Sequence, residues 1–195
     1  MKTPTKGELT RARVIREARI LITARGFKNT TINEIIQATG VKKGAMYFHF
    51  SSKDELGLAV LTDARDEFFA FLDQAVAGDS PMERLNAMMA ALLRQQENTH
   101  FVGGCLFGNT ALEMSDSHEE FARIIQAVFV HWIDLLTEII LRGQEDGTIT
   151  SALPARSLAK TVVAVVEGGI MMARASKKTS DFTDCTRTVN ALLTT

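Results

Sequence analysis

Two short apolar segments separated by one glycine constrain the fold of this chain more than any other feature of its sequence. The first, TINEIIQAT, begins with Thr31 and has Glu34 three residues on, which is the capping-box pattern of a helix start. Gly40 ends this segment, because glycine adopts a positive φ without a steric penalty. A second short segment, residues 43–48, follows almost at once. Two short helices joined around a glycine by about three residues form a helix-turn-helix.

The rest of the chain is also predicted to be helical. Prolines are few, and no sustained period-2 alternation with hairpin turns interrupts the helical periodicity. The sequence predicts an all-α protein of about nine helices, with a three-helix DNA-binding domain at residues 1–51 and a helical bundle domain at residues 52–195. Helix 52–77 is expected to link the two. The other expected helices lie at 7–24, 81–96, 105–114, 119–142, 154–175 and from 181 onward.

The charge is distributed unevenly along the chain. Residues 1–50 contain ten lysines and arginines and three acidic residues, a net charge of +7, whereas the remainder carries −8. A basic segment on an acidic body indicates a protein that presents one end to a polyanion such as DNA. A solvated basic helix face is the alternative that charge alone leaves open.

The second helix of the motif carries groups that suit contact with DNA, since the N-terminal residues of such a helix meet the major groove. Lys42 and Lys43 place cations at a helix N-terminus, where the dipole disfavours them unless phosphates lie near. Phe48 and Phe50 are expected to pack inside the small domain instead. The predicted DNA-contacting residues are Thr31, Lys42, Lys43, Gly44, Ala45, Met46, Tyr47, His49, Ser52 and Lys53.

The run TTINEIIQATGVKKGAMYFHFSSKDEL resembles the DNA-binding segment of TetR-type transcriptional repressors, and the match covers about residues 10–60. The matching positions are Gly40, Val41, Lys43, Gly44, Tyr47, His49, Phe50, Ser52 and Lys53. The resemblance implies a homodimer that binds a palindromic DNA operator and is released by a small-molecule effector. A repressor is the expected function, and a transcriptional activator with the same DNA-binding domain is the alternative.

The resemblance also implies an effector cavity and a dimer interface in the C-terminal domain. Aromatic, methionine and other residues expected to line the cavity are Phe69, Met88, Met89, Leu92, Phe101, Cys105, Phe107, Met114, Phe129 and Trp132. Core packing is the alternative for each of them. The last two helices are expected to form the interface through Ala159, Val163, Val166, Gly168, Ile170, Phe182, Val189 and Leu192.

Cys105 is the most distinctive residue of the C-terminal domain. It follows two glycines and starts a predicted helix, where the helix dipole favours a thiolate. The run VGGCLFGNTALEMSD is similar to a subgroup of TetR-type regulators, some of which sense electrophiles or oxidants through a cysteine at this place. A small buried residue is the alternative reading. Cys185 is expected to pack on the last helix.

Other functional classes are disfavoured by the motifs. No nucleophile elbow, phosphate-binding loop, dinucleotide fingerprint or metalloprotease motif is present, so we expect neither an enzyme nor a cofactor. The two cysteines form no zinc-site pattern, and no metal is expected. We expect a cytoplasmic protein, because the N-terminus lacks a signal-peptide pattern and no uninterrupted apolar run is long enough to span a membrane.

Overall fold

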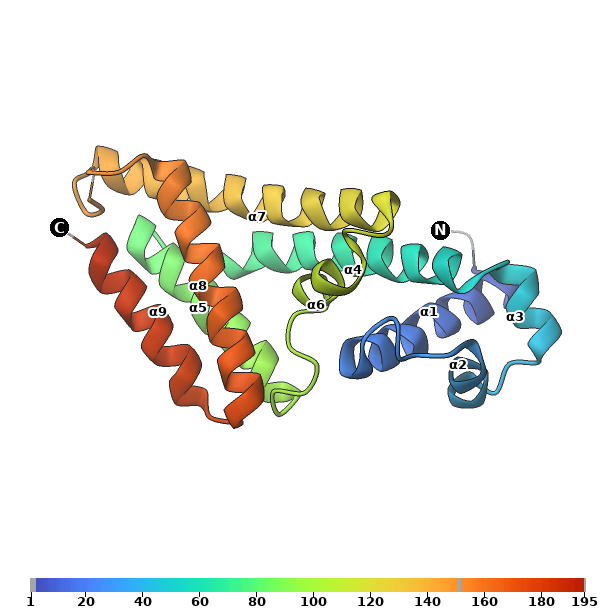
Figure 1. The fold of residues 1–195 in the computed structure, drawn as a ribbon. Helices are drawn as coiled ribbons and strands as arrows, with labels where there is room; N and C mark the ends of the chain where they lie inside the picture. The colour runs from blue at the N-terminus through green and yellow to red at the C-terminus, as the bar shows by residue number, and fades with distance from the viewer. Residues whose placement is uncertain (1–2, 151, 195) are drawn as a thin grey trace. The chain divides into compact units, whose positions relative to one another are not determined.

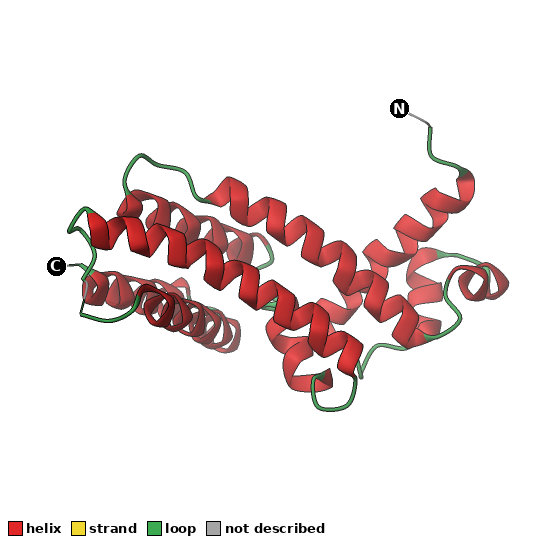
Figure 2. Ribbon diagram, turned by 90° about the horizontal axis from the view of Figure 1, so that it is seen from above, coloured by secondary structure: helices red, strands yellow, loops and turns green. Residues whose placement is uncertain are grey.

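The computed structural model describes residues 3–150 and 152–194, and its regular elements in these ranges are all helices (Figures 1 and 2). The helices are α1 (Lys6–Arg25), α2 (Ile32–Thr39), α3 (Lys43–His49), α4 (Lys53–Ala75), α5 (Pro81–Asn98), α6 (Leu106–Met114), α7 (Glu119–Glu145), α8 (Ala155–Ser176) and α9 (Thr179–Leu193). The predicted all-α architecture is confirmed, and the predicted helices match the observed ones to within about one turn at each end.

Local capping chemistry explains where several helices begin. Thr5 with Glu8, Thr31 with Glu34 and Ser80 with Glu83 each form a complete capping box at the start of α1, α2 and α5. Each box satisfies backbone N–H groups that the first helical turn leaves unpaired.

Cα packing divides the chain into two compact units. Unit 1 takes in the chain up to Asp66 together with Leu106–Ile125, and unit 2 consists of Glu67–Cys105 and the chain from Gln126 onward. The division falls within α4 and α7, so unit 1 is larger than the predicted domain of residues 1–51. It contains α6, which is distant in sequence from the helix-turn-helix.

Unit 1 is built around an apolar core to which α6 and the start of α7 contribute. The rings of Phe27 and Phe121 meet edge to face with their centroids 5.0 Å apart. They lie against Gly57, where a Cβ would come within 2.4 Å of Phe27 and 2.8 Å of Phe121. The carboxylate of Glu113 on α6 accepts a 2.9 Å hydrogen bond from the backbone N–H of Lys28 in the α1–α2 connection.

Unit 2 has its own core, in which α8 and α9 make the most extensive helix–helix contact (Figure 1). The indole N–H of Trp132 on α7 donates to the sulfur of Met88 on α5 at 3.3 Å, inside this core. The largest buried side chains of the unit include Trp132, Phe182, Leu72, Leu85 and Met88.

Helix α7 is long and apolar enough, by length and composition, to count as a candidate membrane span, which the sequence analysis did not expect. Its side chains Phe121 and Ile125 are buried in unit 1, and Trp132, Leu136 and Ile140 are buried in unit 2. A core helix meets the same criterion, so this is weak evidence for a membrane segment.

Candidate nucleic-acid interface

The turn between α2 and α3 has the geometry that the sequence predicts. Gly40 lies in the left-handed region with φ 65°, and its N–H donates to the carbonyl of Ile36 at 2.9 Å. The hydroxyl of Thr39 donates to the carbonyl of Ile35 at 2.8 Å and accepts from the N–H of Val41 at 3.3 Å. Val41 is buried, so the turn is fixed by both hydrogen bonds and packing.

Helix α3 is held in unit 1 by Met46 and by Phe50, which follows its last residue. Met46 is 0% exposed and Phe50 is also buried, with the guanidinium of Arg11 5.3 Å from the centre of the Phe50 ring. The predicted contact of Met46 with DNA is therefore wrong, because the side chain is enclosed in the core. The prediction that Phe50 packs inside the domain is confirmed.

Phe48 lies on the surface of α3, contrary to the prediction that it packs in the core. Its side chain is 84% exposed. Tyr47 beside it is 46% exposed, and Lys42, Lys43 and Gly44 are exposed as well. Ala45 and His49 are partly buried. The outward face of α3 thus combines two cations, an open glycine and two aromatic rings.

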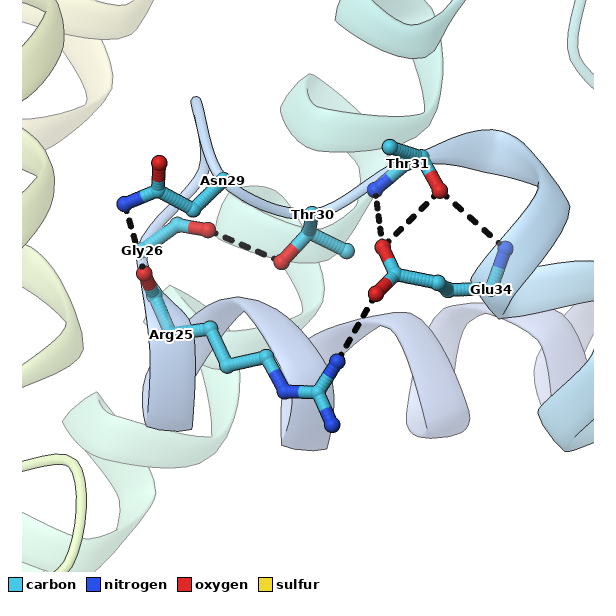
Figure 3. Close-up of polar contacts among 6 residues, drawn as sticks. All are labelled: Arg25, Gly26, Asn29, Thr30, Thr31 and Glu34. Atoms are coloured by element: carbon cyan, nitrogen blue, oxygen red, sulfur yellow. Dashed lines mark hydrogen bonds and ion pairs between the residues drawn. The ribbon is translucent and has the colours of Figure 1, made fainter.

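Thr31 is the N-cap residue of α2 (Figure 3). Its hydroxyl donates to a carboxylate oxygen of Glu34 at 2.8 Å, accepts from the N–H of Glu34 at 3.2 Å, and its own N–H donates to the same carboxylate. These bonds hold the pKa of Glu34 below its usual value, first through the backbone N–H of Thr31 and then through its hydroxyl. Arg25 on α1 completes the cluster with a 2.8 Å ion pair to Glu34.

Two serines and Glu55 form the hydrogen bonds at the start of α4. The hydroxyl of Ser52 accepts the N–H of Glu55 at 3.0 Å, as expected of an N-cap. The carboxylate of Glu55, however, accepts from the hydroxyl and N–H of Ser51 rather than from Ser52. These bonds to Ser51 lower the pKa of Glu55. Ser51 and Ser52 are both exposed at this helix N-terminus.

Lys53 is partly enclosed within unit 1. Its ammonium lies 4.5 Å from the centre of the Phe27 ring and donates to the carbonyl of Lys28 at 3.3 Å. Burial lowers the pKa of Lys53, and the charges of Asp54, Glu113 and Glu34 oppose that effect. This lysine therefore links α4 to the α1–α2 connection, a structural role beside its predicted phosphate contact.

The predicted effector-binding residues divide between the two units. Phe107 and Met114 are buried in unit 1. Within unit 2, five of them are buried core residues, and Phe69, Cys105 and Phe129 are partly buried. Phe69 stacks on His131 at 3.9 Å between ring centroids, and the buried Nε2 of His131 has no hydrogen-bond partner. The five buried residues are Met88, Met89, Leu92, Phe101 and Trp132.

Two cavities of unit 2 are lined mostly by residues outside the predicted effector-binding set. One of about 280 Å³ lies between α5 and α9 and includes only Met89 of the predicted set. The other, of about 340 Å³, is lined by residues of α8, α9 and the segment before α8, among them Thr161, Leu158, Val189 and Leu192.

The predicted dimer interface is corrected by the packing of α8 and α9. Six of its residues are buried inside unit 2 of the chain itself, and a side chain enclosed in its own protomer does not reach a partner. Gly168 is partly exposed, and Leu192 is 71% exposed. The buried residues are Ala159, Val163, Val166, Ile170, Phe182 and Val189.

Cys105 lies against α8. Its thiol hydrogen-bonds to the carboxyl group of Glu167, a residue that the sequence analysis missed although it is the only acid in the apolar run of α8. Burial raises the pKa of Glu167, and the bond from Cys105 opposes this. The second carboxyl oxygen, Oε1, is buried without a partner. Arg174 approaches the same segment, since a Cβ on Gly104 would come within 3.3 Å of its Cδ.

We expect Glu167→Gln to make the protein more stable at pH 8. The raised pKa means that the folded chain holds this proton more tightly than the unfolded chain, so stability falls as pH rises from the unfolded pKa through the folded one. A glutamine side chain does not ionise, so the variant does not lose stability through this group as pH rises. Urea unfolding between pH 5 and pH 8 should show a smaller pH-dependent loss for the variant than for wild type. Exposed Glu138→Gln is the control, and a Glu167→Gln variant that loses as much stability as wild type would contradict the assignment.

Comparison with known proteins agrees with this geometry. Residues 14–60 match the family described as bacterial regulatory proteins of the tetR family, and residues 81–189 match the tetracyclin repressor-like C-terminal domain. The transcriptional repressor DhaR of Mycobacterium sp. (strain GP1) is 30% identical over 75% of this chain and 73% of its own length. The transcriptional regulator AcuR of Cereibacter sphaeroides is 28% identical over 86% of this chain and 77% of its own.

The fold is shared with solved structures. A regulatory protein TetR from Rhodobacter sphaeroides superposes with a TM-score of 0.89 and 25% identity, covering 95% of this chain and 99% of that one. These homologues are transcriptional regulators rather than enzymes. The matched segments together take in the helix-turn-helix and α5 to α9, and the chain belongs to the TetR family of bacterial transcriptional regulators.

Proposed function

We propose that this regulator is a repressor that binds a palindromic operator as a homodimer through α3 and is released by an effector. Regulators of the family bind operator DNA, and they typically dimerise and bind small-molecule effectors. The observation that carries the proposal is the outward face of α3, where Lys42 and Lys43 are exposed while Met46 fixes the helix to the core. The operator lies in the cytoplasm, so the protein acts there.

The residues of α3 and α4 have distinct roles in this proposal. Lys42 and Lys43 contact phosphates or guanine edges at the entrance to the major groove. The exposed Gly44 lets the duplex approach the helix backbone, because nothing lies within 4 Å of the position of its missing Cβ. Tyr47 reaches a phosphate with its hydroxyl, and Ser52 offers a hydroxyl at the N-terminus of α4, where the free N–H groups favour an anion.

The exposed side of α8 and α9 supports dimerisation. Charged residues such as Lys160 and Arg187 are exposed there, but so are several small or apolar residues, of which Gly168 only partly: Thr161, Ala164, Gly168, Met171, Met172, Ala191 and Leu192. Thr161 of α8 and Leu192 of α9 line the same 340 Å³ cavity, so both lie on one side of the helix pair. Met171 is 64% exposed, and such a surface suits the partner's α8 and α9.

A thiol-responsive repressor is the second form of the proposal, and the position of Cys105 favours it. The thiol hydrogen-bonds to the Glu167 side chain of α8, so an adduct on its sulfur would break this contact. Release of DNA by an electrophile from wild type but not from Cys105→Ser would support this form. Release of neither would favour a non-covalent effector. An activator remains the alternative to a repressor.

Removing either α3 cation should weaken DNA binding and reduce its salt dependence. Each lost phosphate contact lowers the slope of log K against log salt concentration by about 0.9. We would first enrich a duplex from a random-sequence pool with wild type, then titrate Lys42→Ala and Lys43→Ala against it at several salt concentrations. Exposed Lys178→Ala on unit 2 is the control and should behave as wild type. Unchanged slopes in both α3 variants would refute their phosphate contacts.

Gly168→Trp should convert the protein to a monomer without unfolding it. Nothing lies within 4 Å of a Cβ at this position, so a side chain can begin there without a clash in the protomer, whereas a partner helix packed across Gly168 would meet the indole. Analytical ultracentrifugation would show half the wild-type mass, and binding to the enriched duplex should weaken at least about tenfold because half-sites are no longer bound together. Exposed Asp73→Trp on α4 should leave the dimer intact. A dimeric Gly168→Trp would place the interface elsewhere.

A further inference from the structure

Phe48 stands out on the face of α3 that the proposed function assigns to DNA. It is 84% exposed on a helix whose other large apolar residue, Met46, is buried. Isolated exposed hydrophobic side chains are common on protein surfaces and by themselves mean little. This one directly follows the half-exposed Tyr47 on a helix of seven residues, whose exposed residues also include Lys43 and Gly44.

The surroundings of the ring leave it open to a ligand. Gly44 precedes Phe48 by four residues and therefore lies on the same helix face one turn earlier. A helical side chain leans toward the preceding turn, and Gly44 there carries no side chain to meet the Phe48 ring. Nothing lies within 4 Å of the missing Cβ. The contact that the structure records for the ring itself is with the neighbouring His49, edge to face at 5.2 Å.

We propose that Phe48 is a specificity-determining residue that reads thymine by packing against its 5-methyl group in the major groove. The inference rests on the proposed function, since it needs α3 to enter that groove. The thymine methyl is the apolar group that base edges present there, and an aromatic ring with no polar atom suits it. The charges of Lys42 and Lys43 attract DNA of any sequence through its phosphates. Contact between the Phe48 ring and a base adds selectivity for thymine.

The test replaces single thymines by deoxyuridine, which removes only the methyl group. A duplex enriched by wild type from a random-sequence pool is resynthesised with one such replacement at a time, and binding is measured for wild type and Phe48→Ala. At one thymine in each half-site, wild type should lose about fourfold in affinity, the effect of one buried methyl group. Phe48→Ala should bind the parent duplex more weakly and lose nothing further at that thymine.

Leu112→Ala, which truncates another highly exposed apolar side chain of unit 1, is the matched control and should keep the full response to deoxyuridine. Because Phe48 is exposed, Phe48→Ala should unfold at the wild-type temperature, which separates lost contact from lost fold. Wild type that tolerates deoxyuridine at every thymine overturns the inference, as does Phe48→Ala that remains equally sensitive. An even loss of affinity on all duplexes would instead assign the ring to the sugar-phosphate backbone. Failure of wild type to enrich any sequence would count against the proposed function itself.

Discussion

The burial of Met46 is the interaction on which the proposed DNA-binding surface of α3 depends. A helix of seven residues is too short to be stable alone, so α3 exists because its inner face packs in unit 1. Enclosing a methionine side chain contributes about 1.5–3 kcal/mol. With Met46 inside and Val41 and Phe50 buried at either end, the helix cannot rotate without exposing its anchor. The orientation of its cations and aromatic rings is thus set by the core.

A second constraint joins α6 to that core. Glu113 binds the N–H of Lys28, and its carboxylate occupies the space that a Cβ at Gly26 would fill, at 2.3 Å from Oε1. Gly26 has φ 90°, which suits glycine and lets the chain pass the carboxylate closely. The segment that follows Cys105 is therefore part of the unit that contains the helix-turn-helix. A displacement of α6 would act directly on the connection between α1 and α2.

The sequence predicted the helices well because caps and glycines are local signals, as at Thr31 and Gly40. It placed Phe48 in the core and Met46 on the surface, the reverse of their observed exposure, because a helix of seven residues with apolar residues on several sides shows no clear periodicity. The inner side of α8 was assigned to a partner, because residues 161–173 contain Glu167 as their only charged residue and only packing shows which side is enclosed. The bond between Cys105, which precedes α6, and Glu167 of α8 joins residues distant in sequence, which no local pattern reveals.

The most direct test of this account is amide hydrogen exchange with and without excess random-sequence duplex DNA at low salt. Exchange reports local opening of backbone hydrogen bonds, so a bound duplex should slow it where the protein is covered. We expect slower exchange in peptides covering residues 41–53 and little change in residues 155–193. Unchanged exchange across residues 41–53, with protection elsewhere in the chain, would contradict the claim that α3 and the start of α4 meet the DNA.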